Sequence, residues 1–503
     1  MHLAPDEHIR KRDLTRGLAS LIKEGVYAQA VGALTAGVLL VGYGLALGAS
    51  NFIIGLLAAV PFLAQLTQIP AILLVERLRA RRAIAVVCIS ASRLLIIPLA
   101  FLPWLPSREL AQILLVVGIA LSAALGAISG CGWNSWVHDL VPGQNLGNFF
   151  SRRLFYATTF SMVVGLTAGF FVQWWDGAYP DAAAYAYAVL FLLGAASGAM
   201  STWHLSHVPE PRMAPPERVI HLGHMLAEPF HDRKFRRLIG FLAAWQFATN
   251  LAAPFFTVYM VSQLHFNMGF VTFMMVVSQL ANVLLLRKWG ELSDRFSNKA
   301  VLRVSGPAFL LCIFAWTMLS LPANHMVVGV LVTLLHIAMG FAVAGINLAS
   351  GNIGLKMAPQ GRGTAYLAAS SIVNSVAAGI APIIGGLFAD DFAARELSLV
   401  VRWTSGPEAM EFITLRLRHW DFFFMLACLF GLYALHRLSL VEEDGHVDDR
   451  AVMQEILMEA RRTVTTLSSV SGLRQLTSFP WGKIVEAARA KRMRPRGPQS
   501  EAP

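Results

Sequence analysis

The stretch that decides the fold of this chain is residues 325–349, which read HMVVGVLVTLLHIAMGFAVAGINLA. It contains no Asp, Glu, Lys or Arg. A helix needs about 20 predominantly apolar residues to cross the hydrocarbon core of a bilayer, so this stretch predicts a transmembrane helix.

Eleven further apolar runs accompany this one. The whole chain of 503 residues is 56% hydrophobic and 14% charged, with a mean hydropathy of +0.56, whereas soluble domains have about 45–50% apolar and about 25% charged residues. We therefore expect an all-α integral membrane protein with twelve transmembrane helices. The expected helices cover residues 24–48, 51–75, 83–105, 110–138, 154–175, 182–204, 237–262, 267–288, 299–321, 325–349, 363–388 and 419–438.

This composition argues against an enzyme. About half of the chain is expected to lie in lipid, which leaves no room for a large soluble catalytic domain. The sequence also contains no Gly-x-Ser-x-Gly elbow, no Gly-Lys phosphate loop and no His-Glu-x-x-His site.

A polar, proline-containing stretch at residues 206–236 separates the runs into two blocks of six. We expect five parts: an amino-terminal arm (1–23), a six-helix bundle (24–205), a linker (206–236), a second six-helix bundle (237–438) and a soluble tail (439–503).

Basic residues gather in alternate connections. One set of loops carries Arg77, Arg79, Arg81, Arg82, Arg152, Arg153, Arg287, Lys288, Arg295, Lys299, Lys356 and Arg362, whereas the short loops of the other set hold only Arg108. Because Lys and Arg accumulate on the cytoplasmic side, we expect both termini in the cytoplasm and the protein in a bacterial inner membrane. The net charge of +11 then reflects sidedness and attraction to anionic lipid, not nucleic-acid binding.

The two blocks repeat in sequence. Glu76-Arg77 lies between the second and third runs, and Asp294-Arg295 lies 218 residues later between the eighth and ninth. Asp139-Leu140-Val141-Pro142 and Lys356-Met357-Ala358-Pro359 follow the fourth and tenth runs at an offset of about 217. Two markers at one offset indicate a duplication, as internal repeats of transporters would give.

With this repeat, the chain resembles the major facilitator superfamily. The segment Gly290-Glu291-Leu292-Ser293-Asp294-Arg295-Phe296-Ser297-Asn298-Lys299 is similar to that family's Gly-x-x-x-Asp-Arg-x-Gly-Arg/Lys-Arg/Lys loop, with Ser297 and Asn298 departing from the pattern. The resemblance covers about residues 20–440. It implies two six-helix halves that rock around a central site and expose it alternately to each side.

The paired acids and cations of these loops predict a charge latch. Glu76, Arg77, Asp294 and Arg295 are expected to pair across the halves when the cytoplasmic mouth closes, although the arginines alone could anchor helix ends at headgroups.

Small residues in the fifth and eleventh helices are expected to form sliding faces between helices, with static packing as the alternative. They are Gly165, Gly169, Gly379, Pro382, Gly385 and Gly386.

Polar side chains at mid-depth are the candidate solute contacts, since an unpaired polar group in hydrocarbon is costly and tends to mark a water-filled cavity. In the helices that line the cavity in the family's fold, they are Gln65, Gln68, Gln246, Asn250, Gln279, Asn282, His336, Asn374 and Ser375. Each amide could instead bridge helices. His336 could couple transport to protons, because its unperturbed pKa is about 6.5, or it could be a hydrogen-bonded interior histidine.

Two appendages extend the bundle. Residues 390–418 alternate apolar and polar side chains around Ser405-Gly406-Pro407, which predicts an external β-hairpin. After Leu440, apolar residues from Met453 to Val470 recur at helical spacing, which predicts a cytoplasmic amphipathic helix. The hairpin could cap the exit, bind a protein partner or be a passive surface element. The helix could lie on the inner leaflet or against the cytoplasmic loops, or it could bind a protein partner.

Nothing in the sequence indicates a metal or a cofactor. Cys88, Cys131, Cys312 and Cys428 lie in apolar runs without a Cys-x-x-Cys pair, so we expect free thiols. A copper site built from the 18 methionines is disfavoured, because none form a regular run at cavity depth.

The leading hypothesis is a monomeric transporter, secondary active or facilitative, for a small neutral or amphipathic solute. The second hypothesis is a transporter-like membrane scaffold that holds partners and moves no solute. The solute, the direction of transport and the coupling ion do not follow from the sequence.

Overall fold

The computed structural model describes residue 5 and residues 9–443, apart from 143–145, 214–221, 321, 323, 360–362 and 406–407. Among these residues, twelve helices are long and apolar enough to cross a membrane, which confirms the predicted number. The cytoplasmic amphipathic helix expected between Met453 and Val470 lies outside the described residues.

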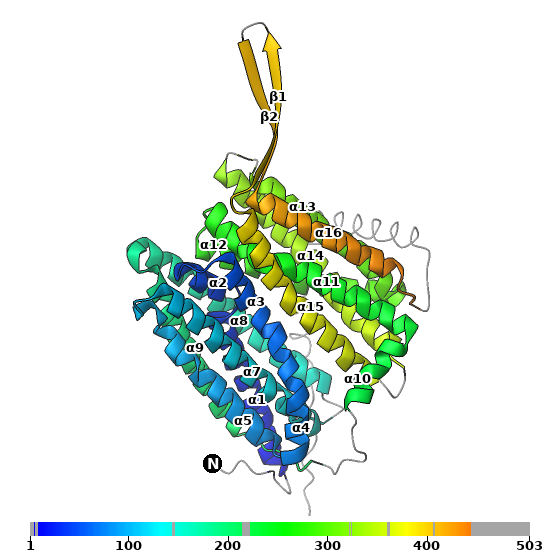
Figure 1. The fold of residues 1–503 in the computed structure, drawn as a ribbon. Coiled ribbons are helices and arrows are strands. Elements are labelled where there is room, and N and C mark those ends of the chain that lie inside the picture. The colour runs from blue at the N-terminus through cyan, green and yellow to red at the C-terminus, as the bar shows by residue number, and fades with distance from the viewer. Residues whose placement is uncertain are drawn as a thin grey trace, which may run out of the picture.

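The first half runs from blue to cyan in Figure 1. Its helices are α1 (Lys11–Thr35), α2 (Gly37–Ala46), α3 (Asn51–Ala64), η1 (Gln65–Thr67), α4 (Gln68–Leu78), α5 (Arg81–Leu94), α6 (Ile96–Ala100), η2 (Leu102–Trp104), α7 (Arg108–Leu140), α8 (Leu146–Ala178), η4 (Pro180–Ala182) and α9 (Ala183–Ser206). Short breaks interrupt the first three spans, so that α1–α2, α3–α4 and α5–η2 each make one crossing.

The second half runs from green to orange. It contains α10 (Leu222–His231), α11 (Arg233–Val258), η5 (Tyr259–Gln263), α12 (Met268–Arg295), α13 (Asn298–Thr317), η6 (Met318–Ser320), α14 (His325–Met357), α15 (Gly363–Phe392) and α16 (His419–Ser439). Helix α10 lies in the segment expected to be a plain linker and packs against α15 and α11.

Several helices extend beyond the apolar runs that predicted them. Helix α1 begins at Lys11 instead of residue 24, and α14 continues to Met357 instead of ending near residue 349. In α1 the extension is stabilised by packing, because Leu14, Leu18 and Leu21 join a small apolar cluster beneath α5, α7 and α9. An apolar run predicts only the part of a helix that crosses the hydrocarbon core. These helices are longer than that part, so their ends were not predicted.

The bundle has two distinct ends. The basic end is the end at which α1, α5, α11 and α13 begin, and the hairpin end is the opposite one. The strands β1 (Glu396–Ser405) and β2 (Glu408–Arg418) project from the hairpin end (Figure 1). They pair antiparallel, from Glu396 opposite Arg418 to Ser405 opposite Glu408, with a register shift between Leu399 and Val400. The predicted hairpin is therefore confirmed.

The two halves meet mainly where α3 packs against α15 and α8 against α12, and α2 also packs against α11. Small residues make the first approach close: a Cβ atom placed on Gly55 of α3 would lie 2.1 Å from the carbonyl oxygen of Pro382 in α15. In the second pair, a Cβ on Gly169 would lie 1.9 Å from Oγ1 of Thr272. Both contacts lie in the part of the helices nearer the hairpin end.

Candidate functional site

A cavity of about 310 Å³ lies between the halves, on the side of the basic end. Phe62 of α3 forms one wall, and the remaining walls come from α11, α14 and α15 of the second half. The lining residues are Phe62, Leu242, Gln246, Ser350, Gly351, Gly354, Leu367, Ser370, Ser371, Asn374, Ser375 and Ala378. No charged side chain is among them, so the cavity offers neutral hydrogen-bonding groups beside apolar surface.

Two polar atoms in this lining lack a protein partner. Within the described residues, Oγ of Ser350 and Oδ1 of Asn374 are buried and make no hydrogen bond. The other end of the Asn374 amide is held, since Nδ2 donates to Oγ of Ser370 at 3.5 Å. Buried polar groups are nearly always satisfied, so a solute or water in the cavity would supply the missing partners.

The structure brings three of the predicted solute contacts to this cavity, namely Gln246, Asn374 and Ser375. Asn250 lies one turn from Gln246 on α11, and its Nδ2 donates to the backbone carbonyl of Gln246 at 2.9 Å. The same Nδ2 donates to Oε1 of Gln246 at 3.3 Å. The Asn250 side chain therefore positions the Gln246 amide and does not line the cavity itself.

The other candidates lie elsewhere. At the break between α3 and α4, Nε2 of Gln68 donates a hydrogen bond to Oε1 of Gln65. On α12, Gln279 is exposed and Asn282 is half-buried, and neither lines the cavity.

His336 departs most from expectation. It is 2% exposed, its Nδ1 donates to the carbonyl of Val332 at 2.9 Å, and its ring meets that of Trp316 edge-on at 5.6 Å. The structure therefore places His336 in the interior of the second half instead of at the cavity. These contacts favour the alternative stated above, a hydrogen-bonded interior histidine.

Sequence reasoning missed Phe62 and three of the serines, Ser350, Ser370 and Ser371. The spacing of Ser370, Ser371, Asn374 and Ser375 on α15 carries a signal, because residues three to four apart share one helix face. Serine is common throughout this chain, so that signal alone does not single them out.

Of the six small residues expected to form sliding faces, four lie where the halves meet. A Cβ on Gly379 would lie 2.5 Å from Leu63 and one on Gly386 would lie 2.4 Å from the carbonyl of Asn51, while Gly169 and Pro382 make the contacts described above. The remaining two pack within one half, Gly165 near Ala33 and Gly385 against Leu251. Gly55 was missed, and so was Gly269, where a Cβ would lie 2.1 Å from Oε1 of Gln173.

A carboxylate closes the hairpin end of the same interface. Asp390 of α15 accepts hydrogen bonds from the backbone N–H groups of Asn51 and Phe52 at 3.1 and 2.9 Å, and from Nδ2 of Asn51 at 2.8 Å. It thus satisfies two amides that the first turn of α3 leaves without a helical partner. Asp390 ties the second half to the first at this end.

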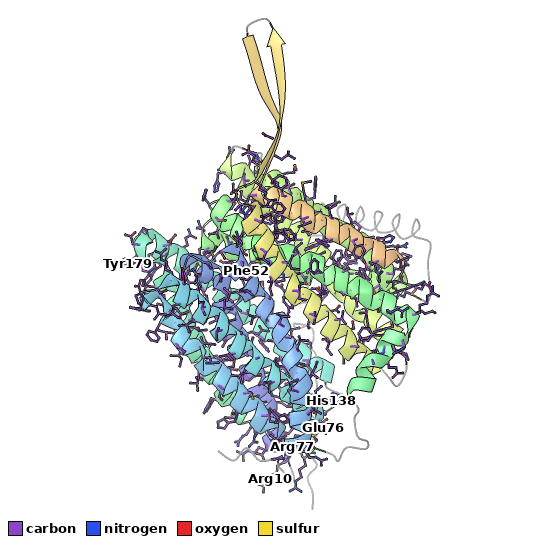
Figure 2. All side chains as sticks on the ribbon, in the orientation of Figure 1. Arg10, Phe52, Glu76, Arg77, His138 and Tyr179 are labelled. Atoms are coloured by element: carbon purple, nitrogen blue, oxygen red, sulfur yellow. The ribbon has the colours of Figure 1, made fainter. Side chains whose placement is uncertain are left out.

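The predicted latch residues lie at the opposite end. Figure 2 shows Glu76 and Arg77 near Arg10, far from Phe52. Within the described residues, Glu76, Arg77 and Asp294 form no ion pair, and the guanidinium of Arg295 lies 5.3 Å from the ring of Phe296. The pairing of these residues in a state closed at the basic end stays a prediction.

A charge cluster around a buried arginine was missed at the basic end of the first half. Arg81, at the start of α5, donates its backbone N–H to Glu210 at 2.8 Å and its guanidinium to Asp139 at 2.5 Å. The guanidinium also donates to the carbonyl of Pro211 at 2.9 Å and to that of Ser135 at 3.1 Å. The cluster ties the start of α5 to the end of α7 and to the segment after α9.

The second half repeats this arrangement. Glu443, which follows α16, accepts from the backbone N–H of Lys299 at 2.8 Å, from Asn298 at 3.0 Å and from Nζ of Lys356 at 3.0 Å. Lys299 and Lys356 follow Arg81 and Asp139 by 218 and 217 residues, the offsets of the sequence repeat. Each half is therefore braced at its basic end by a glutamate beyond its last helix.

Burial alone would raise the pKa of Glu443, but hydrogen bonds from Lys299, Lys356 and Asn298 lower it below the ordinary glutamate value. The folded-state pKa is therefore lower than the unfolded-state pKa of about 4.3. It follows that the contribution of Glu443 to folding is fully present above that pH and is lost as the pH falls through the folded-state pKa.

A further buried acid belongs to an ion pair between helices of the first half. Glu24 of α1 is 7% exposed and pairs with Arg153 of α8 at 2.7 Å. The arginine also lies over the ring of Trp133 at 4.8 Å and crosses α1 beside Gly25, where a side chain would collide with it. This pair links α1 to α8 and does not line the cavity.

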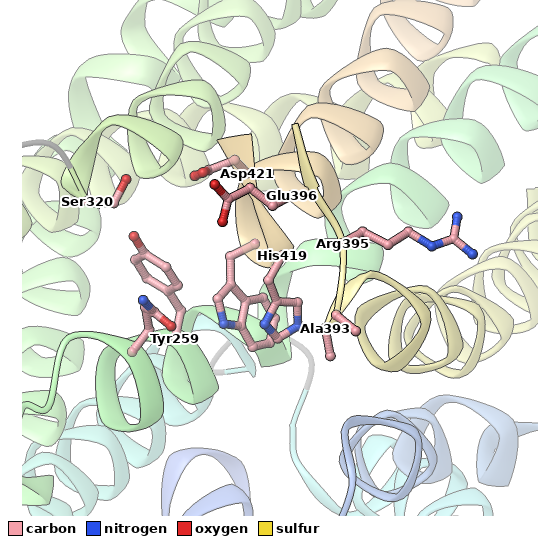
Figure 3. A pocket seen from close by; sticks show the side chains of 10 residues that line it. Tyr259, Ser320, Ala393, Arg395, Glu396, His419 and Asp421 are labelled. Atoms are coloured by element: carbon pink, nitrogen blue, oxygen red, sulfur yellow. The ribbon is translucent and has the colours of Figure 1, made fainter. Parts of the chain in front are cut away.

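A larger cavity of about 590 Å³ lies at the root of the hairpin. Figure 3 shows the hydroxyl groups of Tyr259 and Ser320 on one side of this cavity and the carboxylates of Asp421 and Glu396 on the other side. This cavity opens at the hairpin end, and none of its lining residues belongs to the cavity between the halves. It is therefore separate from the candidate solute site.

Metal binding finds no support in the described part of the chain. No group of three or more His, Cys, Asp or Glu side chains there could hold an ion, and all four cysteines are free.

Comparisons with known proteins place this geometry in context. A family model described as Major Facilitator Superfamily matches residues 26–382 and 247–484. No curated protein matches. Among solved structures, the nucleoside transporter NupG is similar, with 13% identity and a TM-score of 0.59, covering 86% of this chain and 100% of its own.

Two further structures are similar. A D-xylose-proton symporter has 12% identity and a TM-score of 0.61, covering 86% of this chain and 98% of its own. A POT family transporter in complex with 5-aminolevulinic acid has 10% identity and a TM-score of 0.57, covering 88% and 99%. At these identities the likeness concerns the fold alone.

Proposed function

This chain belongs to the major facilitator superfamily, and on that premise we propose that it transports a small neutral or amphipathic solute by alternating access. The observation that carries the proposal is the uncharged cavity between the halves, with its two unsatisfied polar atoms. The transport is secondary active or facilitative.

The chemistry of the lining supports a neutral solute. Serine hydroxyls and two amides can donate and accept hydrogen bonds without a fixed charge, while Phe62, Leu242 and Leu367 supply apolar surface. A volume of about 310 Å³ is at the lower end of the range of about 300–1,000 Å³ found for small-molecule sites. The similar structures include transporters for a nucleoside and for xylose, but at their low identity the solute class rests on the cavity.

The state described here is closed at the hairpin end. Asp390 and the glycine contacts hold α3 against α15 there, and the cavity lies on the side of the basic end. Rocking of the halves would break these contacts and bring the loops that contain Glu76 and Asp294 together. The cavity would then face the other side of the membrane.

We place the basic end in the cytoplasm of a bacterial cell, since Lys and Arg accumulate on that side. Reporter fusions after Lys23, Lys234 and Leu440 should give cytoplasmic signals, and a fusion near Ser405 should give an external one. The comparison of alkaline phosphatase and fluorescent-protein reporters at these sites measures this directly. A cytoplasmic signal at Ser405 would contradict the orientation.

The solute site is tested by Asn374→Leu, which keeps bulk and removes the unsatisfied carbonyl oxygen. Loss of a partner for a buried polar group costs about 1–3 kcal/mol, so solute affinity should fall about fivefold to 150-fold, at 1.4 kcal/mol per tenfold. The measurement is counterflow into proteoliposomes with a panel of labelled nucleosides and pentoses, preceded by mass spectrometry of molecules that copurify.

Asn282→Leu is the matched control, because it makes the same change on α12 away from the cavity. It should leave affinity near that of the native protein. Equal effects of the two substitutions would mean that these amides join helices and that the cavity is not the solute site.

The alternative function, a membrane scaffold without transport, is favoured by one observation. The hairpin of β1 and β2 projects well beyond the bundle (Figure 1), where it contributes nothing to the cavity. A partner that copurifies in fixed stoichiometry, together with no flux for any solute of the panel, would support the scaffold.

A further inference from the structure

A third cavity of about 620 Å³ lies on the first half at its basic end. Its walls come from the first turns of α1, the start of α5 and the end of α9. The lining residues are Asp13, Arg16, Ala19, Ser20, Lys23, Arg82, Trp203, His204, Ser206, His207 and Pro209. Three fixed cations therefore surround it with only one carboxylate.

Two of these cations are available to a ligand. Arg16, Ser20 and Lys23 share one face of α1 because they are four and three residues apart. Within the part of the chain that the structure describes, Arg16 and Lys23 are exposed and take part in no ion pair or hydrogen bond. Asp13, the carboxylate in the wall, is likewise exposed and pairs with neither of them.

The deeper part of the pocket adds donors. The guanidinium of Arg82 is buried and donates from Nη1 to the carbonyl of Val208 at 3.2 Å. His207 is anchored through Nδ1, which donates to the carbonyl of Trp203 at 2.7 Å. Arginine, lysine and hydroxyl groups around one space are the donors that bind phosphate oxygens.

The position of the pocket points to a lipid. Trp203 is 51% exposed, and its ring lies 4.8 Å from each of the rings of His204 and His207. Exposed tryptophan is typical of the bilayer interface. On the same helices, Val87 of α5 and Met200 and Leu193 of α9 are 59%, 41% and 53% exposed, which provides apolar surface for acyl chains.

We propose that this pocket binds the phosphate group of an anionic phospholipid in the leaflet at the basic end, with Arg16 and Lys23 as the principal contacts and Trp203 at the interface. Basic pockets between transmembrane helices at this level suit such headgroups. A bound lipid would bridge α1 and α9 and brace the first half. The proposal does not depend on the solute or on transport.

Native mass spectrometry of the full chain in detergent, titrated with phosphatidylglycerol or phosphatidylcholine, tests it. The native protein should bind phosphatidylglycerol more tightly. The double variant R16Q/K23Q should lose about 30-fold in affinity, which is about 2 kcal/mol at 1.4 kcal/mol per tenfold and corresponds to about 1 kcal/mol for each basic residue near the membrane surface. Its unfolding temperature without lipid should be unchanged, since both residues are exposed.

The matched control is K11Q/R12Q, which removes the same charge from the same helix outside the pocket. It should reduce the affinity by less than threefold. Equal losses in the two double variants would overturn the proposal in favour of diffuse attraction to a basic surface. Inorganic phosphate is tested last, as a competitor of the lipid. If phosphate binds as tightly as phosphatidylglycerol and displaces this lipid, the pocket binds a soluble anion and the lipid assignment is wrong.

Discussion

Replacement of Gly55 by alanine should open the hairpin end of the protein. A Cβ atom at this position would lie 2.1 Å from the carbonyl oxygen and 3.0 Å from the carbonyl carbon of Pro382, and a backbone group cannot rotate away as a side chain does. Overpacking of this kind costs about 1–3 kcal/mol. Since the collision exists only while α3 and α15 are together, it should favour the state open at this end about fivefold to 150-fold.

The separation can be measured by double electron–electron resonance between spin labels at Glu109 and Met326, which are both exposed at the hairpin end, after the four native cysteines are replaced. The distance distribution should shift to longer values in Gly55→Ala. Gly126→Ala is the control, because no atom lies within 4 Å of its added Cβ. An unchanged distribution in Gly55→Ala would show that this contact does not control closure.

A second substitution weakens the same interface by removing hydrogen bonds to a carboxylate. Asp390→Ala removes the three hydrogen bonds to Asn51 and Phe52, so it should shift the same distances in the same direction. Asp391→Ala is its neighbour and control, since Asp391 is exposed and pairs with Arg395 at 2.8 Å outside the interface. If both aspartate variants behave alike, the clamp assigned to Asp390 is wrong.

The largest loss of stability is expected for Glu210→Gln. Glu210 is 0% exposed and faces the buried guanidinium of Arg81. Glutamine keeps an oxygen for the backbone N–H of Arg81 but removes the negative charge. Breaking a buried ion pair from one side costs about 3–5 kcal/mol, and because Arg81 keeps Asp139 we expect about 3 kcal/mol.

The measurement is the free energy of unfolding by denaturant titration in detergent micelles. Glu291→Gln provides the comparison, because Glu291 is also paired, with Arg287 and Lys288, but is exposed. Exposed pairs contribute about 0–1 kcal/mol, so this variant should remain near the native value. Comparable losses in both variants would mean that the Arg81 cluster does not brace the first half.

Much of the architecture follows from local pattern. The twelve spans could be read from run length and composition, because a bilayer demands about 20 apolar residues per helix wherever that helix packs. The hairpin could be read from the alternation between Leu397 and Arg418, since the two faces of a strand differ in environment. The sequence repeat contains Asp139 and Lys356, which belong to the charge clusters at the basic ends of the two halves. Glu210 and Glu443, the central acids of these clusters, were not recognised from the sequence.

The site depended on tertiary structure. Asn374 and Asn282 are both amides at mid-span, yet only Asn374 reaches the cavity. His336 is likewise a polar residue in the middle of an apolar run, but its ring packs against that of Trp316. Most residues on every face of a membrane-spanning helix are apolar, so the spacing of the few polar residues does not by itself reveal which face meets water.

The sequence by itself therefore determined the number of membrane-spanning helices and the hairpin at one end, and it predicted where the two halves divide. Tertiary structure alone decided which small residues hold the halves together, which polar groups share a cavity and which charges are buried as pairs. The physical reason is that hydropathy reports the transfer of one segment into lipid, whereas a site is made by the rotation and approach of helices far apart in sequence. Gly55 and Pro382 lie 327 residues apart along the chain, and only their contact across the two halves gives either residue its role.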